Sequence, residues 1–156
     1  MRWSVLAIGQ RMPHWVEAGW NEYERRFPRG FDLQLRELPA AKRSRNADID
    51  MIRTREGESL LAAVPNSDRV IALDENGKQW STAELADHMR QWMQHGENVS
   101  FLVGGPDGLS QPCLDRSDHC WSLSRLTFPH PLVRAVLAEQ LYRAWTVTQN
   151  HPYHRE

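Results

Sequence analysis

Residues 99–110 read VSFLVGGPDGLS, a short apolar run that leads directly into a glycine-rich turn. The run Val99–Val103 predicts a buried strand, because a short apolar segment bounded by turn residues is typical of parallel sheets. Glycines in the turn, residues 104–108, let a backbone approach a ligand closely. The turn is neither GxGxxG nor a P-loop and lacks a phosphate-binding lysine, so a structural turn and a binding loop are both open interpretations.

Strands and helices are expected to alternate along the rest of the chain. Period-two patterns and apolar runs predict strands at residues 1–10, 31–35, 69–73 and 121–128. Helical spacing of apolar residues predicts helices from Pro13 to about Phe27, from Ile49 to Val64, from Ser81 toward Gly96 and from Leu132 to Trp145. This alternation predicts an α/β fold with a mostly parallel sheet and helices on both faces. The length of 156 residues predicts a single domain over residues 1–156.

Individual residues predict where several of these elements begin, end and face. Asn46 or Asp48 can cap the second helix, and Ser81–Glu84 forms a capping box for the third. Residues 75–77, Glu-Asn-Gly, predict a turn after the third strand. In the first helix, Trp15 belongs to the apolar stripe that would cover the sheet.

The net charge of the chain is close to zero, since 19 Lys and Arg oppose 20 Asp and Glu to give −1. The chain therefore lacks the overall basic field that is usual for proteins gripping nucleic acid by its backbone. Any RNA contact would need a local patch, and the most basic window is Lys42–Arg45. A solvated loop and an RNA-phosphate patch are both open interpretations of this window.

Cysteine usage and hydropathy restrict the cellular setting. Cys113 and Cys120 are too few for a disulfide framework, and the apolar run Val5–Ile8 is too short for an export signal. We therefore expect a soluble cytoplasmic protein with reduced thiols. No apolar stretch approaches the roughly 20 residues of a membrane span. No pair of Cys or His residues has the compact spacing of a zinc site, so we expect no metal.

Three loops are placed to bind a ligand, because crevices in parallel sheets lie beyond the carboxyl ends of the strands. Two of these loops follow Leu73 and Val103, and the third spans Leu126–His130. The chain contains no GxSxG elbow, HExxH pair or kinase signature, which disfavours hydrolase, metalloprotease and kinase functions. The residues themselves thus predict an α/β domain with a small-molecule crevice at this edge of the sheet.

The chain ends with a second group of candidate functional residues. Tyr153, His154 and Arg155 offer an aromatic face, a group that titrates near neutrality and a guanidinium. Chain ends often fray, so a disordered tail is the alternative interpretation.

Three segments resemble the SPOUT class of methyltransferases: residues 102–110 (LVGGPDGLS), 123–134 (LSRLTFPHPLVR) and 139–145 (EQLYRAW). The ending NHPYHRE at 150–156 narrows this to a resemblance to the ribosomal RNA large subunit methyltransferase H family. The similarity runs along the whole chain and includes PAAKR at 39–43. It implies methylation of N3 of a pseudouridine in 23S large-subunit ribosomal RNA, on assembled ribosomes, with S-adenosyl-L-methionine as cofactor.

The resemblance also implies a deep trefoil knot near the C-terminus, a rare exception to the rule that chains do not thread loops. In this family the cofactor lies bent in the knotted loops, which coincide with the three strand-end loops. By position, the cofactor-binding residues are expected to be Leu73, Gly104, Gly105, Leu123, Ser124, Arg125, Leu126, Thr127 and Phe128.

Family members act as homodimers, so the resemblance implies that the last helix packs against its mate and that two subunits share the RNA site. N3 is a weakly acidic imide whose proton must leave, so a base or a cation that stabilises the anion should help. His154 and Arg155 are the first candidates for these roles, and Tyr153 would stack on or bracket the base. His130 and Arg143 are the second candidates.

Other functions are compatible with the same segments. A SPOUT methyltransferase with another acceptor, such as transfer RNA, is the first alternative, because cofactor segments do not encode the acceptor. A noncatalytic ribosome-associated binding factor that retains the fold is the second. A net charge of −1 also predicts weak binding to free RNA fragments and dependence on the assembled ribosome.

Overall fold

The computed structural model describes residues 1–155, in which strands and helices alternate almost throughout. Their order is β1 (Arg2–Ile8), α1 (His14–Glu24), β2 (Asp32–Leu38), α2 (Ile49–Ala63), β3 (Arg69–Gln79), α3 (Thr82–Gln94), β4 (Val99–Val103), α4 (Gln111–Arg116), β5 (His119–Ser122), α5 (His130–Thr148) and the 3-10 turn η1 (Pro152–Arg155). Glu156, the last residue of the NHPYHRE ending, lies outside the described residues.

The strands form one sheet in the order β2-β1-β4-β3-β5, and each neighbouring pair is parallel. Trp3 of β1 and Arg69 of β3 both pair with Val99 of β4, so the three central strands are in register. Because the strands are parallel, the loops after β1, β3, β4 and β5 leave from the same edge of the sheet. The α/β class with a parallel sheet is confirmed.

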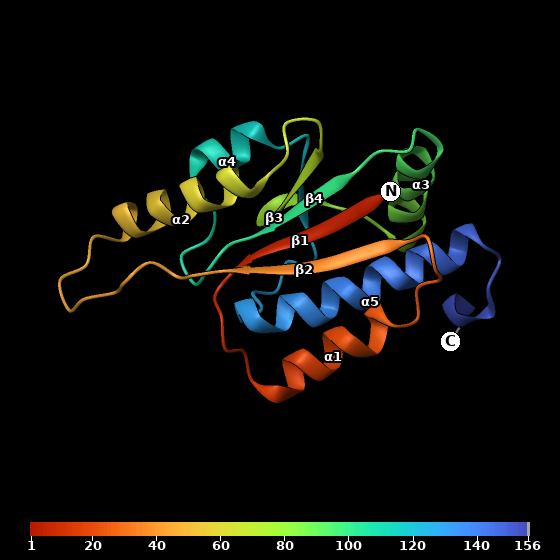
Figure 1. Ribbon diagram of the computed structural model, residues 1–156, viewed down its shortest axis with the longest axis horizontal. Coiled ribbons are helices and arrows are strands. Elements are labelled where there is room, and N and C mark those ends of the chain that lie inside the picture. Colours follow the sequence, from red (N-terminus) through yellow and green to blue (C-terminus); the bar gives the residue numbers. More distant parts are fainter. Residues whose placement is uncertain (156) are drawn as a thin grey trace.

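Helices cover both faces of the sheet, as expected (Figure 1). α1 and α5 lie on one face, where α3 packs beside α5, and α2 and α4 lie on the other. Strand residues alternate between the two cores because successive side chains point to opposite faces. Thus Trp3 and Val5 of β1 pack on the α1, α3 and α5 side, whereas Leu6 and Ile8 pack against α2 and α4.

The first helix differs from its prediction in two respects. α1 ends at Glu24, three residues before Phe27, because the chain tightens into turns in which Phe27 N–H donates to the Glu24 carbonyl. Trp15 is 57% exposed and does not join the apolar face. Val16 and Trp20 occupy that face, and a residue one step along a helix points about 100° away.

The predicted turn at Glu75-Asn76-Gly77 is wrong. β3 continues to Gln79, and residues 74–77 form an irregularity in its pairing with β5, where the register shifts between Leu73 and Lys78. The backbone at Gly77 runs so close to β5 that a Cβ there would lie 2.5 Å from the Cys120 carbonyl oxygen. Glycine therefore serves the close approach of two strands here, not a chain reversal.

The fifth strand is shorter than predicted, and one helix was not predicted at all. β5 ends at Ser122, because its hydroxyl donates to the Ser124 carbonyl and the chain then turns away. The alternation at 123–128 therefore belongs to a loop. α4 has only six residues, too few for a helical apolar pattern to identify it.

Several local predictions are confirmed. Asp48, and not Asn46, caps α2 by accepting from the Asp50 N–H, and Ser81 caps α3 by accepting from the Glu84 N–H. Both cysteines carry free thiols. No helix within residues 1–155 is long and apolar enough to cross a bilayer. The trefoil knot stays a prediction, because strand order and pairing do not define which loop a chain passes through.

Candidate active site

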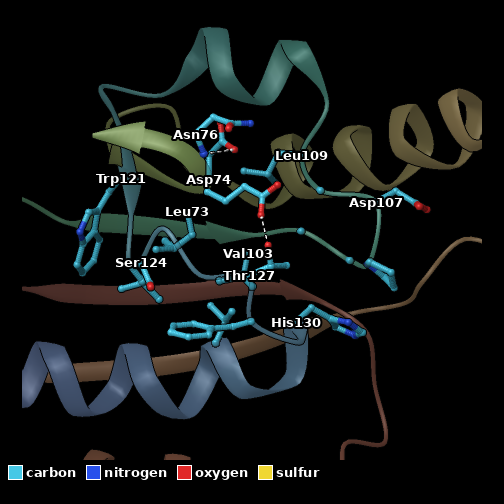
Figure 2. A pocket seen from close by; sticks show the side chains of 18 of the residues that line it. Leu73, Asp74, Asn76, Val103, Asp107, Leu109, Trp121, Ser124, Thr127 and His130 are labelled. Atoms are coloured by element: carbon cyan, nitrogen blue, oxygen red, sulfur yellow. Dashed lines mark hydrogen bonds between the residues drawn. The ribbon is translucent and has the colours of Figure 1, made fainter. Parts of the chain in front are cut away.

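A cavity of about 450 Å³ opens beside the irregular part of β3 and the carboxyl ends of β4 and β5, in front of the first turn of α5 (Figure 2). This is the strand-end edge at which the sequence predicts a crevice. The apolar part of the lining comes from these strands, the loops that follow them, α4 and α5: Leu73, Val103, Leu109, Leu114, Trp121, Leu123, Leu126, Phe128 and Val133.

The glycine turn, residues 104–108, forms one wall of this cavity. Its ends are tied together, since Gly108 N–H donates to the Gly105 carbonyl (3.0 Å) and Gly108 has a φ of +79°. A Cβ at residue 104 would lie 2.7 Å from the carbonyl carbon of Gly108, so no larger residue fits without moving the backbone. The turn is therefore both structural and part of a binding wall, which combines the two interpretations of the sequence.

The opposite wall is the loop at residues 123–128. Its curvature is fixed by the Ser124 hydroxyl, which accepts from the Leu126 N–H (2.9 Å). The Thr127 hydroxyl donates to Glu75 (3.0 Å) and thereby ties this loop to the irregular part of β3 (Figure 2). Leu126 stays 73% exposed, which leaves an apolar side chain at the mouth of the cavity.

The charged groups of the lining favour a cationic ligand over a phosphate. Asp74, Glu75 and Asp107 supply three carboxylates, of which that of Asp107 is ion-paired with Arg43. Arg53 also lines the cavity, and its Nε–H donates to the Asp107 carbonyl (3.0 Å). The carboxylates of Asp74 and Glu75 would attract the positively charged part of a ligand and repel a phosphate placed beside them.

His130 begins α5 at the edge of the cavity (Figure 2). Burial lowers its pKa below the ordinary value, and the charges of Arg134 and Arg43 lower it further. The imidazole is therefore neutral at physiological pH.

The predicted cofactor residues come together with one exception. Leu73, the glycine pair at 104–105 and every residue of 123–128 except Arg125 line the cavity. The sequence predicts a ligand-binding loop after Leu73, but it did not single out Asp74, Glu75 and Asn76 as site residues, because residues 75–77 were interpreted only as a turn. The two acidic residues directly after Leu73 were the feature of the sequence that could have indicated these site residues.

The tail residues do not reach this cavity within one chain. Tyr153, His154 and Arg155 lie in η1, at the far end of α5 from His130 (Figure 1). The tail folds back along α5, where Tyr153 bonds to Glu139, nine residues or about 14 Å along the helix axis from His130, and no tail residue lines the cavity. Arg143, also predicted as a site residue, lies at the tail end.

The tail is ordered by a cluster around Glu139. The Tyr153 hydroxyl (2.9 Å) and the Arg143 Nε–H (2.9 Å) both donate to the same carboxylate oxygen of Glu139. The Arg143 guanidinium lies 5.0 Å from the centre of the Tyr153 ring, and the Tyr142 ring packs edge-on against it. Burial raises the pKa of Tyr153, and the hydrogen bond to Glu139 raises it further. The frayed-tail alternative is therefore wrong for residues 152–155.

The basic window belongs to a long connection between β2 and α2, residues 39–48, which we call the basic arm and which extends beyond the sheet in Figure 1. Lys42 and Arg45 are exposed on it. Arg43 instead forms an ion pair with Asp107 in the glycine turn. The arm is therefore neither a purely solvated loop nor a patch with all its charges free for RNA.

No group of three or more His, Cys, Asp or Glu side chains within residues 1–155 is arranged to hold a metal ion.

The chain is similar to known proteins along its whole length. The family model described as predicted SPOUT methyltransferase matches residues 1–154. A protein of Marinomonas sp. (strain MWYL1) named ribosomal RNA large subunit methyltransferase H is 54% identical over 155 residues, which are 99% of this chain and 100% of that protein. A protein of Hahella chejuensis (strain KCTC 2396) with the same name is 54% identical over 156 residues, which are 100% of both chains.

Proposed function

Since the chain belongs to the SPOUT methyltransferase family, we propose that it methylates N3 of a pseudouridine in 23S ribosomal RNA, on assembled ribosomes, with S-adenosylmethionine. The observation that carries this proposal is the 54% identity, along the full chain, to two proteins named ribosomal RNA large subunit methyltransferase H. Such an enzyme works in the cytoplasm, where ribosomes are.

The cavity has the features that S-adenosylmethionine requires. When bound, this cofactor supplies an electrophilic methyl group on a positively charged sulfur. The carboxylates of Asp74 and Glu75 favour a ligand with such a charge. The glycine turn lets the backbone approach, and the apolar side chains of Leu73, Leu126 and Phe128 exclude water from the remainder.

The acceptor site requires a second copy of the chain. In one protomer the tail packs on residues 139–143 of α5, and no tail residue lines the cavity at the first turn of this helix. An antiparallel pair of α5 helices would bring the tail of each copy to the cavity of the other. Leu132, Val136 and Val147 are apolar, only half-buried and spaced along one side of α5, which suits such an interface.

Each of the three tail residues then has a different proposed role in the methyl transfer. The pKa of Tyr153 is raised, so its phenol stays protonated and suits stacking or hydrogen bonding better than proton removal. His154 is half-buried, and its Nδ1 is buried without a hydrogen-bond partner among the described residues, so removal of the N3 proton would use the other ring nitrogen, Nε2. Arg155 is exposed and would stabilise the anion left on the base.

The test is methyl transfer from labelled S-adenosylmethionine to ribosomes that lack the modification. Separated subunits, transfer RNA and ribosomes without the pseudouridine are assayed in parallel. We expect label in large-subunit RNA of assembled ribosomes only when the pseudouridine is present. Label in transfer RNA would favour a different SPOUT acceptor, and cofactor binding without label in any RNA would favour a noncatalytic ribosome-binding factor.

A further inference from the structure

Glu56 is a buried carboxylate on α2 that neither the cavity nor the tail contains. Its side chain is 2% exposed. Oε2 accepts from the backbone N–H of Ala41 in the basic arm (3.1 Å), whereas nothing among residues 1–155 donates to Oε1. A buried carboxylate oxygen without a donor is costly, so Glu56 must be held in place by strong neighbouring constraints.

Oε1 faces the glycine turn. A Cβ at residue 105 would lie 3.1 Å from this oxygen, so the carboxylate packs directly against the turn that lines the cavity. Helix α2 comes this close because its next residue is Gly57, where a Cβ would lie 2.1 Å from the Ser110 hydroxyl oxygen. The position of Glu56 is therefore fixed by tight packing of α2 on the segment that follows the turn.

Arg43 joins the same carboxylate to the turn from the arm. Its guanidinium forms an ion pair with Asp107, and its other amino group lies 3.9 Å from Oε2 of Glu56. The side chain of Arg43 is 37% exposed, so a phosphate group in solvent can compete for it. A chain of contacts thus runs from the arm through Arg43 and Glu56 to the wall of the cavity.

We infer that Glu56 is a positioning residue that fastens the basic arm to the glycine turn and thereby couples the arm to the cavity. Through Ala41 and Arg43 it orders the arm, and Arg43 carries the restraint to Asp107. Any ligand that changes the order of the arm must change the affinity of the cavity, and the effect is reciprocal. The inference rests on the proposed function for its two ligands, RNA phosphate at the arm and S-adenosylmethionine in the cavity.

The first test measures the ligand-free protein by amide hydrogen exchange. Glu56→Gln keeps an acceptor for the Ala41 N–H but removes the charge beside Arg43. We expect amides of the glycine turn, residues 104–108, to exchange about fivefold faster in this variant, because local opening becomes easier. Glu58→Gln, two residues along α2 and exposed, removes the same charge and should leave these amides unchanged.

The second test measures binding of S-adenosylhomocysteine by calorimetry. Glu56→Gln should weaken binding about five- to tenfold, whereas Glu58→Gln should bind as the wild type does. Arg43→Gln should weaken binding by a similar factor. The double variant Arg43→Gln/Glu56→Gln should lose less binding free energy than the two single variants together, since both residues act through one chain of contacts. If Glu56→Gln destabilises the whole protein, the affinity of Arg43→Gln, a substitution at the surface, is sufficient to test the inference.

The coupling itself is tested with ribosomes. In the wild type, S-adenosylhomocysteine affinity should differ between free and ribosome-bound protein, and the difference should disappear in Arg43→Gln. Faster exchange in the arm with an unchanged glycine turn and unchanged affinity would overturn the inference. Failure of the wild type to methylate ribosomes would instead refute the acceptor and leave the exchange result standing, so the two failures are distinguishable.

Discussion

The two ends of α5 hold their candidate residues by different means. At the first turn, beside His130, the cavity is built from backbone: a glycine turn closed on itself and a serine-braced loop. Farther along the helix, the tail is held by side chains that share one carboxylate, Glu139 in the middle of α5, and by ring contacts around Tyr153. One chain thus supplies all the residues that line the cavity, whereas the tail is ordered at a distance from the cavity.

This difference implies that cofactor binding and methyl transfer to RNA have different structural requirements. We expect cofactor binding in the cavity to need only one correctly folded protomer, since all the lining residues come from one chain. The proposed chemistry on an RNA base needs the tail near the cavity, but within one chain the tail is bonded to Glu139 and does not line the cavity. Variants at the two ends should therefore fail in different assays.

The largest effect is expected at the tail. His154→Ala/Arg155→Ala should lower the rate of ribosome methylation about 1,000-fold, because it removes both the candidate base and the candidate cation. S-adenosylhomocysteine affinity should stay that of the wild type, since the tail lies outside the cavity lining. A wild-type rate in this double variant would refute the assigned roles.

The next effect is expected at the glycine turn. Gly104→Ala places a methyl group 2.7 Å from the Gly108 carbonyl carbon, so S-adenosylhomocysteine affinity should fall about 50-fold by calorimetry. Gly30→Ala is the matched control, because its φ of +95° is strained but nothing lies within 4 Å of its Cβ. It should cost stability and leave the affinity intact.

The two variants together test whether the site is shared. Random mixing of Gly104→Ala with His154→Ala/Arg155→Ala should restore about a quarter of wild-type activity at limiting cofactor, because half the dimers carry one intact site of two. No recovery on mixing, with dimers demonstrated, would show that cavity and tail act within one chain.

The smallest effect concerns protonation at the cavity end. The pKa of His130 is lowered, first by burial and then by Arg134 and Arg43, so the folded state disfavours the imidazolium. Stability from this residue is complete above the unfolded value of about 6.5 and is lost as pH falls toward the lower folded value. Nuclear magnetic resonance titration should give a midpoint below 6.5, and the stability advantage over His130→Gln should shrink below that pH. A midpoint at or above 6.5 would contradict this.

Local patterns in the sequence were sufficient for most elements and for part of the site. The run Val99–Val103, the capping by Asp48 and Ser81, and the glycine turn are determined by neighbours along the chain. The failures have a common cause. Residues 75–77 look like a turn that ends the strand, but β3 resumes its pairing with β5 at Lys78, so they form an irregularity within the strand.

Contacts between distant residues account for what the sequence could not show at the site. Arg43 was assigned to a basic window, yet its ion pair is with Asp107. Glu56 has no feature in the sequence that distinguishes it from the exposed Glu58. Only the approach of α2 to the glycine turn, permitted by Gly57, gives it a role.

The sequence by itself determined the α/β class, the strand-end position of the cavity and, through resemblance, the family. These depend on periodicity, turn residues and shared segments, which are properties of short stretches of chain. The tertiary structure alone decided that the tail and the cavity lie at opposite ends of one helix, and that the arm is tied to the cavity wall. Such facts depend on which distant residues the packed sheet and helices bring within a few ångströms, and no local pattern encodes those distances.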